Sequence, residues 1–253
     1  MKVFRGRRAV LIMLGLMVAL VAISHWPVTT RFGINYQWSS QQLPLYEKAV
    51  HFLSRDLQTR RMVHDIVAGI SDDEEKLVRI FSWVTTHIRS VPEGFPIVDD
   101  HPLHILIRGY GPGDQRTEAF VLLAGYAGFQ AGLAKLTPLG RSDHFLIVAL
   151  VDMGPRTFVF DVANRTLFKN RTGGLADTQQ LLAHPEWIGA AAPGRIVQGL
   201  PYEQYFSGLQ RRPSRFSRTD DQQPWPRLSR EAARLLRRGL RATTRGVSER
   251  RHD

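Results

Sequence analysis

Two side chains and one glycine-rich turn have the residue types needed for acyl-transfer chemistry. His144 opens an apolar run of strand length, and Asp161 closes the next such run. A histidine can move protons, and an aspartate beside it can orient the ring and stabilise its charged form. The turn 108–114 leads into an apolar helix whose start we place at Gly113 or Asp114. The free amides and partial positive charge of a helix N-terminus favour a thiolate, an oxyanion or a carboxylate there.

The chain contains no cysteine, which excludes disulfide bonds, thiolate metal ligands and a cysteine nucleophile. Asp114 suits a capping role better than a nucleophilic one, because the helix dipole stabilises its charge. Asp99, Asp100, His101 and His104 lie close together and could hold a divalent metal. Their spacing matches no established metal motif, so we expect a loop of capping aspartates and hydrogen-bonded histidines. We assign no metal and no cofactor.

The elements that must position these residues follow an α+β order, with helices first and an antiparallel strand meander after them. Ser71 to Glu74 form a capping-box pattern that opens one of the helices. Helical spacing of apolar residues predicts helices over 44–60, 62–70, 71–88, 115–127 and 178–183. Runs rich in Val, Leu, Ile and Phe predict strands over 131–136, 144–151 and 157–161, with another at 167–168. The apolar face of the first helix would be Leu45, Ala49, Phe52, Leu53 and Leu57, and that of the third Leu77, Ile80, Phe81, Val84 and Ile88.

Four segments in this order resemble the transglutaminase-like superfamily, which shares the papain-like cysteine protease fold. They are the helix 73–88 with its Trp83, the turn and helix 111–131, the histidine strand 143–148 and the aspartate strand 158–161. In that family a cysteine at the start of a core helix attacks an acyl group, a histidine shuttles the proton, and an aspartate orients the histidine. The resemblance covers residues 71–168 and implies a transglutaminase-like core.

The chain departs from the family at the residue that matters most. The resemblance places Gly113 where the family has its cysteine, and glycine has no side chain that could attack a substrate. It therefore implies a degenerate member without transglutaminase or cysteine protease activity, in which His144 and Asp161 form a remnant pair. The cleft in which members of the family bind their substrate would bind a ligand here, and the resemblance implies an envelope polysaccharide or a peptide. The residues expected to line this cleft are Tyr110, Asp114, Gln115 and Asp143.

Two other functions remain open from the residues alone. In the first, His144 and Asp161 activate a water molecule, and the protein is an amidase or esterase. In the second, the domain is a folded spacer between an anchor and a tail, with no function in its cleft.

The net charge of +11 lies almost entirely at the two ends of the chain. Residues 9–210 carry 17 basic and 18 acidic side chains, whereas residues 211–253 carry 13 arginines against five acids. A nearly neutral body argues against a nucleic-acid-binding fold, which would carry its basic patch on the domain itself.

The N-terminal end predicts a membrane segment. Four basic residues precede the unbroken apolar run 9–23. We interpret residues 1–28 as a signal-anchor or transmembrane segment that contacts the membrane through residues 9–28, with a cleaved secretory signal as the alternative. The positive flank would stay in the cytoplasm. The domain, residues 40–209, would then lie on the periplasmic side of a bacterial inner membrane.

The C-terminal end combines a polar segment with a basic helix. Residues 210–226 contain three prolines and many charges, and we expect a disordered linker. Residues 227–253 place leucines on one helix face and arginines around most of the rest. A basic amphipathic helix of this kind favours an anionic surface or an acidic partner.

Overall fold

The computed structural model describes residues 2–34, 37–96, 101–211, 215–216, 219–230 and 233. The chain divides into two compact units, Met1–Arg55 and Asp56–Asp253, and the boundary falls inside helix α2.

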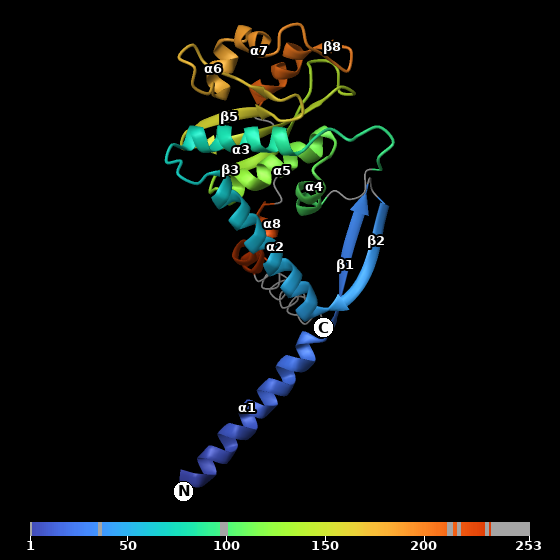
Figure 1. The fold of residues 1–253 in the computed structure, drawn as a ribbon, viewed down its shortest axis with the longest axis vertical. Helices are drawn as coiled ribbons and strands as arrows, with labels where there is room; N and C mark the ends of the chain where they lie inside the picture. Colours follow the sequence, from blue (N-terminus) through green and yellow to red (C-terminus); the bar gives the residue numbers. More distant parts are fainter. Residues whose placement is uncertain are drawn as a thin grey trace, which may run out of the picture. The chain divides into compact units, whose positions relative to one another are not determined.

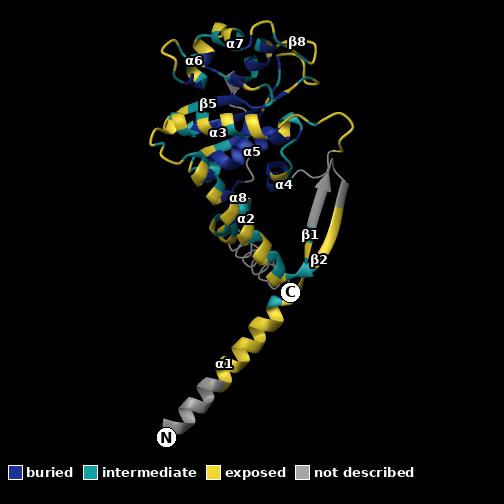
Figure 2. Cartoon of the chain, in the orientation of Figure 1, coloured by how far each residue is buried: buried dark blue, intermediate teal, exposed yellow. Residues whose placement is uncertain are grey.

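The first unit contains one apolar helix and a hairpin. Helix α1 (Lys2–Ser24) is followed by the antiparallel strands β1 (Pro27–Ile34) and β2 (Gln37–Pro44), with Pro27 opposite Pro44. The side chains of α1 are described from Leu11 on, and the large apolar ones among them are at least 53% exposed (Figure 2). Among the side chains that the structure describes, no helix is long and apolar enough to cross a membrane.

Helix α2 (Leu45–Ile66) is one continuous helix where the sequence predicted two. Its predicted apolar face is also wrong, because Leu53 and Leu57 are 50% and 65% exposed. The buried positions are Asp56, Thr59 and Val63. Asp56 accepts hydrogen bonds from Arg60 and from the hydroxyl of Tyr126. The buried side of α2 therefore contains polar side chains that form hydrogen bonds. A search for apolar residues at helical spacing could not identify that side.

The second unit joins helices to an antiparallel sheet, as the α+β order predicted (Figure 1). Its helices up to the sheet are α3 (Asp73–His87), α4 (Pro102–Arg108) and α5 (Gly113–Tyr126). The strands β3 (Gln130–Leu136), β4 (Leu146–Met153), β5 (Arg156–Asp161), β6 (Thr166–Leu167) and β9 (Arg215–Phe216) pair in the order β6-β5-β4-β3-β9. The remaining elements are α6 (Thr178–Ala183), α7 (Glu186–Ala191), β7 (Ile196–Val197), β8 (Leu200–Pro201), the 3-10 helix η1 (Tyr202–Arg211) and α8 (Thr219–Gln222).

Both faces of the sheet are buried, because alternate residues of each strand point to opposite sides. Ala149 and Val151 of β4 join one hydrophobic cluster with α3 and α5, whereas Val148 and Leu150 join a second cluster with α6, α7 and η1. Figure 1 shows α3 and α5 on one side of β5, and α6 and α7 on the other. The sheet is thus the middle of three layers. The predicted apolar face of α3 is confirmed, since all five of its residues are buried.

The helix start near residue 71 differs by one position from the predicted capping box. Asp72 is the N-cap of α3, and its carboxylate accepts from the backbone N–H of Glu75. Ser71 lies outside the helix. Serine and aspartate are both good capping residues, so neighbouring candidates compete and the tertiary fit decides between them.

The segment expected to be a disordered linker contains structure where it is described. Within 210–226, Arg215 and Phe216 form β9 beside β3, and Thr219 of α8 is buried. The backbone is helical over 224–230, and the rest of the tail, apart from residue 233, lies outside the described residues.

Candidate functional site

Helix α5 begins at Gly113, which agrees with the predicted start. Asp114 is exposed in the first turn, whereas Gln115 is buried. The side-chain carbonyl of Gln115 accepts a hydrogen bond from Arg108, and Arg108 also donates to the backbone oxygen of Tyr110. The structure therefore brings Tyr110 and Gln115 together through Arg108, while Asp114 stays on the surface beside them.

The space in front of Gly113 is filled by this chain itself. A Cβ atom built on Gly113 would lie 2.8 Å from the Cβ atom of Ala163, closer than two carbon atoms can pack. Thr117 is fully buried and donates its hydroxyl to the backbone oxygen of Gly113. Gly113 and Thr117 therefore present no side chain to the surface, and Asp114 is the exposed side chain of the first turn.

Ala163 belongs to a tight turn, residues 162–165, that joins β5 to β6. Asp161 holds this turn: its carboxylate accepts from the backbone N–H of Asn164 at 2.9 Å and from the side-chain amide of Asn164 at 2.8 Å. An aspartate that bonds back to the chain a few residues on is a common way to fix a turn. Asp161, which the sequence predicted to be the partner of His144, therefore fixes this turn.

Three further side chains lock Asp161 and its turn into the domain. The hydroxyl of Tyr202 donates to Asp161 at 2.6 Å. Arg195 donates to the backbone oxygen of Asn164 and to the hydroxyl of Thr166, both at 2.8 Å. Arg116 of α5 donates to the backbone oxygen of Ala163 at 3.0 Å. We call Asp161, Asn164, Thr166, Tyr202, Arg195 and Arg116 the Asp161 network.

Burial sets the ionisation of the Asp161 network. Desolvation raises the pKa of Asp161 above its ordinary value, although hydrogen bonds from Tyr202 and Asn164 and the charge of Arg195 act in the opposite direction. Burial, followed by the charge of Asp161, raises the pKa of Tyr202, so its hydroxyl stays protonated and donates. Burial also lowers the pKa of Arg116, and the charge of Asp161 opposes that shift.

His144 does not pair with Asp161. His144 lies in the turn before β4, because that strand begins at Leu146. The pairing of β4 with β5 begins only at Ala149. Nδ1 of His144 is 2.9 Å from the carboxylate of Asp143, yet the geometry falls short of a hydrogen bond, and this buried nitrogen has no hydrogen-bond partner among the described residues. The imidazole is the main cause that lowers the pKa of the Asp143 carboxyl group. Within the described chain, no ion pair or hydrogen bond joins His144 to Asp161.

The structure therefore divides the predicted site into separate groups. Gly113 and Asp161 are brought together through Ala163, Tyr110 and Gln115 meet at Arg108, and Asp143 and His144 contact each other. The analysis of the sequence missed Ala163, Arg116, Arg195 and Tyr202. In the sequence Arg116 stands among the polar residues 114–118 of a helix start, so its burial gave no signal before the structure was known.

No metal site is found in the described part of the chain, where no three His, Asp or Glu side chains come together. His101 accepts a hydrogen bond from the backbone N–H of Leu103 and is the N-cap of α4, a role that the sequence had given to the neighbouring aspartates. Asp99 and Asp100 lie outside the described residues.

Comparisons with known proteins give only a distant likeness. No family model and no curated protein matches the chain. A crystal structure from Cytophaga hutchinsonii, provisionally described as a cysteine protease, is similar over 61% of this chain and 68% of its own, with 10% identity and a TM-score of 0.38. A structure from Parabacteroides distasonis, provisionally described as a protease, is similar over 53% of this chain and 35% of its own, with 8% identity and a TM-score of 0.35.

The contact between Gly113 and Ala163 predicts a compensating pair of substitutions. Alanine is normally better than glycine in a helix, but here its methyl group would collide with Ala163. We expect Gly113→Ala to lower the free energy of unfolding by about 1–3 kcal/mol. Gly113→Ala combined with Ala163→Gly should recover most of that loss in urea unfolding. Ala163→Gly alone is the matched control, and a Gly113→Ala variant as stable as the wild type would refute the contact.

The Asp161 network predicts a pH-dependent effect of Tyr202→Phe. The pKa of Asp161 is higher in the folded state than in the unfolded state, so stability falls as the pH rises from the unfolded-state pKa through the folded-state pKa. The hydrogen bond from the Tyr202 hydroxyl stabilises the ionised carboxylate and reduces this loss of stability. Tyr202→Phe should cost about 1.5–3 kcal/mol of unfolding free energy at a pH above the raised pKa of Asp161, where the carboxylate is ionised. The loss should shrink as the pH falls below the pKa of Asp161.

Tyr205→Phe is the control for this measurement, because the Tyr205 hydroxyl donates to the neutral backbone oxygen of Val197 at 2.8 Å. Its effect on chemical unfolding should not change between neutral and acidic pH. If Tyr202→Phe behaves in the same pH-independent way, the ionised Asp161 is not its acceptor.

Proposed function

We propose that this chain is a non-catalytic binding protein, built on a transglutaminase-like core and held at the cell envelope by α1. The single observation that supports it best is the closure of the helix start at Gly113 by Ala163. The position has no nucleophile, and its space is taken by a turn that the buried Asp161 network fixes. Loss of the nucleophile from an enzyme of this type typically lowers turnover by about a million-fold.

The rival function, hydrolysis by His144 and Asp161, has less support. A general base needs a group that orients it and space for the water that it activates. The hydrogen bonds that Asp161 accepts come from Tyr202 and Asn164, and the contact of His144 is the exposed Asp143. The proposal therefore treats His144 as part of the surface near Asp143, and it does not depend on a remnant dyad.

The membrane part of the proposal is supported by the exposure of α1. Its described side chains form an apolar surface on all sides, from Leu11 to Ile23. A helix in water normally hides such a surface on one face and shows polar residues on the other. We propose that α1 lies in a bacterial inner membrane and that the second unit lies on the periplasmic side. The arginine-rich tail is proposed to meet an acidic partner or an anionic surface.

The proposal predicts that the purified full-length chain does not turn over acyl substrates. Aryl esters, peptide amides and glutamine–amine transfer should all proceed at the rate of the heat-denatured control. His144→Ala should leave these rates unchanged, because no reacting group depends on the imidazole. A turnover that the wild type shows and His144→Ala abolishes would establish the hydrolase instead.

The proposal also predicts where the chain is found after cell fractionation. The full chain should sediment with membranes and resist extraction by high salt, since apolar burial is insensitive to screening. Deletion of residues 1–26 should release the protein into the supernatant. Deletion of residues 227–253, a basic segment of similar length, is the control and should leave it in the pellet. A soluble full-length chain contradicts this part of the proposal.

A further inference from the structure

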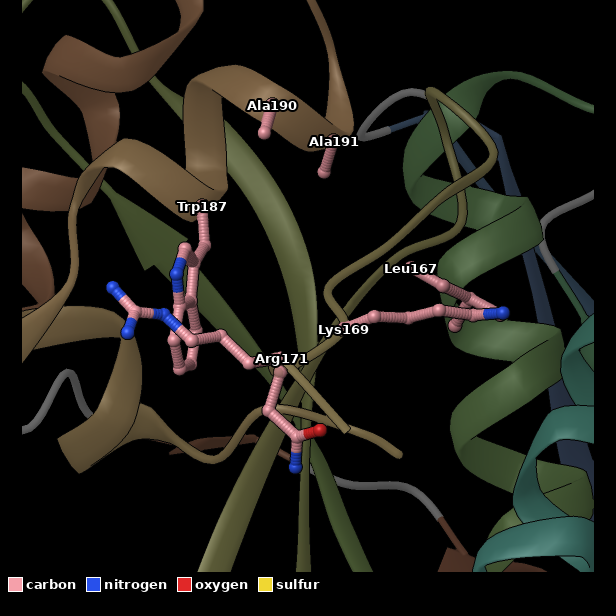
Figure 3. A pocket seen from close by; sticks show the side chains of 7 residues that line it. Leu167, Lys169, Arg171, Trp187, Ala190 and Ala191 are labelled. Atoms are coloured by element: carbon pink, nitrogen blue, oxygen red, sulfur yellow. The ribbon is translucent and has the colours of Figure 1, made fainter. Parts of the chain in front are cut away.

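A second candidate site lies away from Gly113, in a pocket of about 380 Å³ in the second unit. Its lining comes from the β6 end and the loop after it, and from α7 on the other side (Figure 3). The residues that line it are Leu167, Lys169, Asn170, Arg171, Trp187, Ala190 and Ala191. None of them belongs to the Asp161 network.

Trp187 gives this pocket a flat apolar wall. One side of its ring is covered by His184, whose ring centroid is 4.5 Å away at an interplanar angle of 16°. His184 is held in turn by Glu186, whose carboxylate is 3.1 Å from Nδ1. With one face stacked in this way, the indole is fixed in orientation and its remaining surface lines the pocket. Large apolar rings with fixed orientation are typical of ligand sites.

Two exposed cations stand on either side of the same pocket. Lys169 and Arg171 are both exposed. No carboxylate of the described residues lies within ion-pair distance of either one. A backbone hydrogen bond, the His184 ring and the charge of Arg171 lower the pKa of the Glu186 carboxyl group, so one carboxylate lies near Arg171. Figure 3 shows the side chain of Arg171 extending toward the Trp187 side and that of Lys169 extending the opposite way. Two cations beside one carboxylate leave an excess of positive charge at this concave site, which favours an anionic ligand. Their separation favours a ligand that carries its negative charges at intervals.

The loop that carries these cations is held in one conformation by Asn170. The side-chain oxygen of Asn170 accepts from the backbone N–H of Thr172 at 3.0 Å and from the Thr172 hydroxyl at 2.7 Å. The backbone N–H of Asn170 donates to the backbone oxygen of Gly174 at 2.9 Å. The next residue, Leu175, donates its N–H to Glu74 of α3. A loop fixed before binding loses little entropy when a ligand arrives.

We propose that this pocket binds an acidic saccharide, with the face of one sugar ring on Trp187 and carboxylates of the sugar chain at Arg171 and Lys169. A polyuronate has one carboxylate on each sugar, which suits two separated cations. The phosphates of a nucleotide are adjacent, and a neutral glycan gives the cations nothing to bind. The inference rests on the proposed binding function and names the ligand class that this function would serve.

The test is calorimetric titration of the full-length protein in detergent with a short oligogalacturonate, beside a neutral malto-oligosaccharide of equal length and a nucleoside diphosphate. We expect the acidic oligosaccharide to bind and the other two not to. Lys169→Ala with Arg171→Ala should weaken binding by about tenfold or more. Arg61→Ala, which removes an exposed arginine from α2, is the matched control and should leave the affinity unchanged.

Trp187 is tested by two substitutions, because truncating a ring that packs against the second cluster could disturb the fold. Trp187→Phe should keep the fold and weaken binding, and Trp187→Ala should weaken it further. The proposal is overturned if the acidic oligosaccharide does not bind, if the neutral one binds equally well, or if the nucleoside diphosphate binds more tightly. An Arg61→Ala loss equal to that of the pocket variant would also overturn it.

Failure of this inference is distinguishable from failure of the proposed function. The turnover assays and the fractionation involve His144 and α1, and none of the pocket variants changes either. A chain that is inactive and membrane-held but does not bind the oligogalacturonate would leave the proposed function in place and remove only the saccharide site.

Discussion

The buried carboxylate of Asp161 is the interaction on which the candidate site depends. Its oxygens accept from Tyr202 and from Asn164, so a charge that burial makes costly is stabilised by hydrogen bonds on two sides. Because those bonds fix the turn 162–165, they also fix Ala163 against Gly113. One carboxylate thus links the end of β5 to the helix η1 and holds Ala163 against the start of α5.

Arginine side chains complete this arrangement from two directions. Arg116 reaches the turn from α5, and Arg195 reaches it from the segment before β7. Both donate to backbone oxygens of the turn, Arg116 to that of Ala163 and Arg195 to that of Asn164. Two cations near one buried anion also balance its charge.

Much of the framework could be predicted from local patterns. The buried face of α3, the bounds of α6, the start of α5 and the approximate positions of β3, β4 and β5 all follow from apolar spacing and turn residues. These features depend on residues near each other in the chain. The predicted face of α2 was wrong because the burial of Asp56 depends on Tyr126, which lies 70 residues away. The short strand β9 escaped prediction for the same reason, since its partners in β3 are distant in sequence.

The sequence by itself determined that no cysteine can act here, that residue 113 has no side chain, and that helices precede an antiparallel sheet. Only the tertiary structure decided what Asp161 does. The residue types at 144 and 161 are compatible with a dyad, but the β4–β5 ladder and the hydroxyl of Tyr202 direct the carboxylate elsewhere. The physical reason is that a carboxylate binds whichever donors the fold brings within about 3 Å of it, and that choice depends on contacts between residues far apart in the chain.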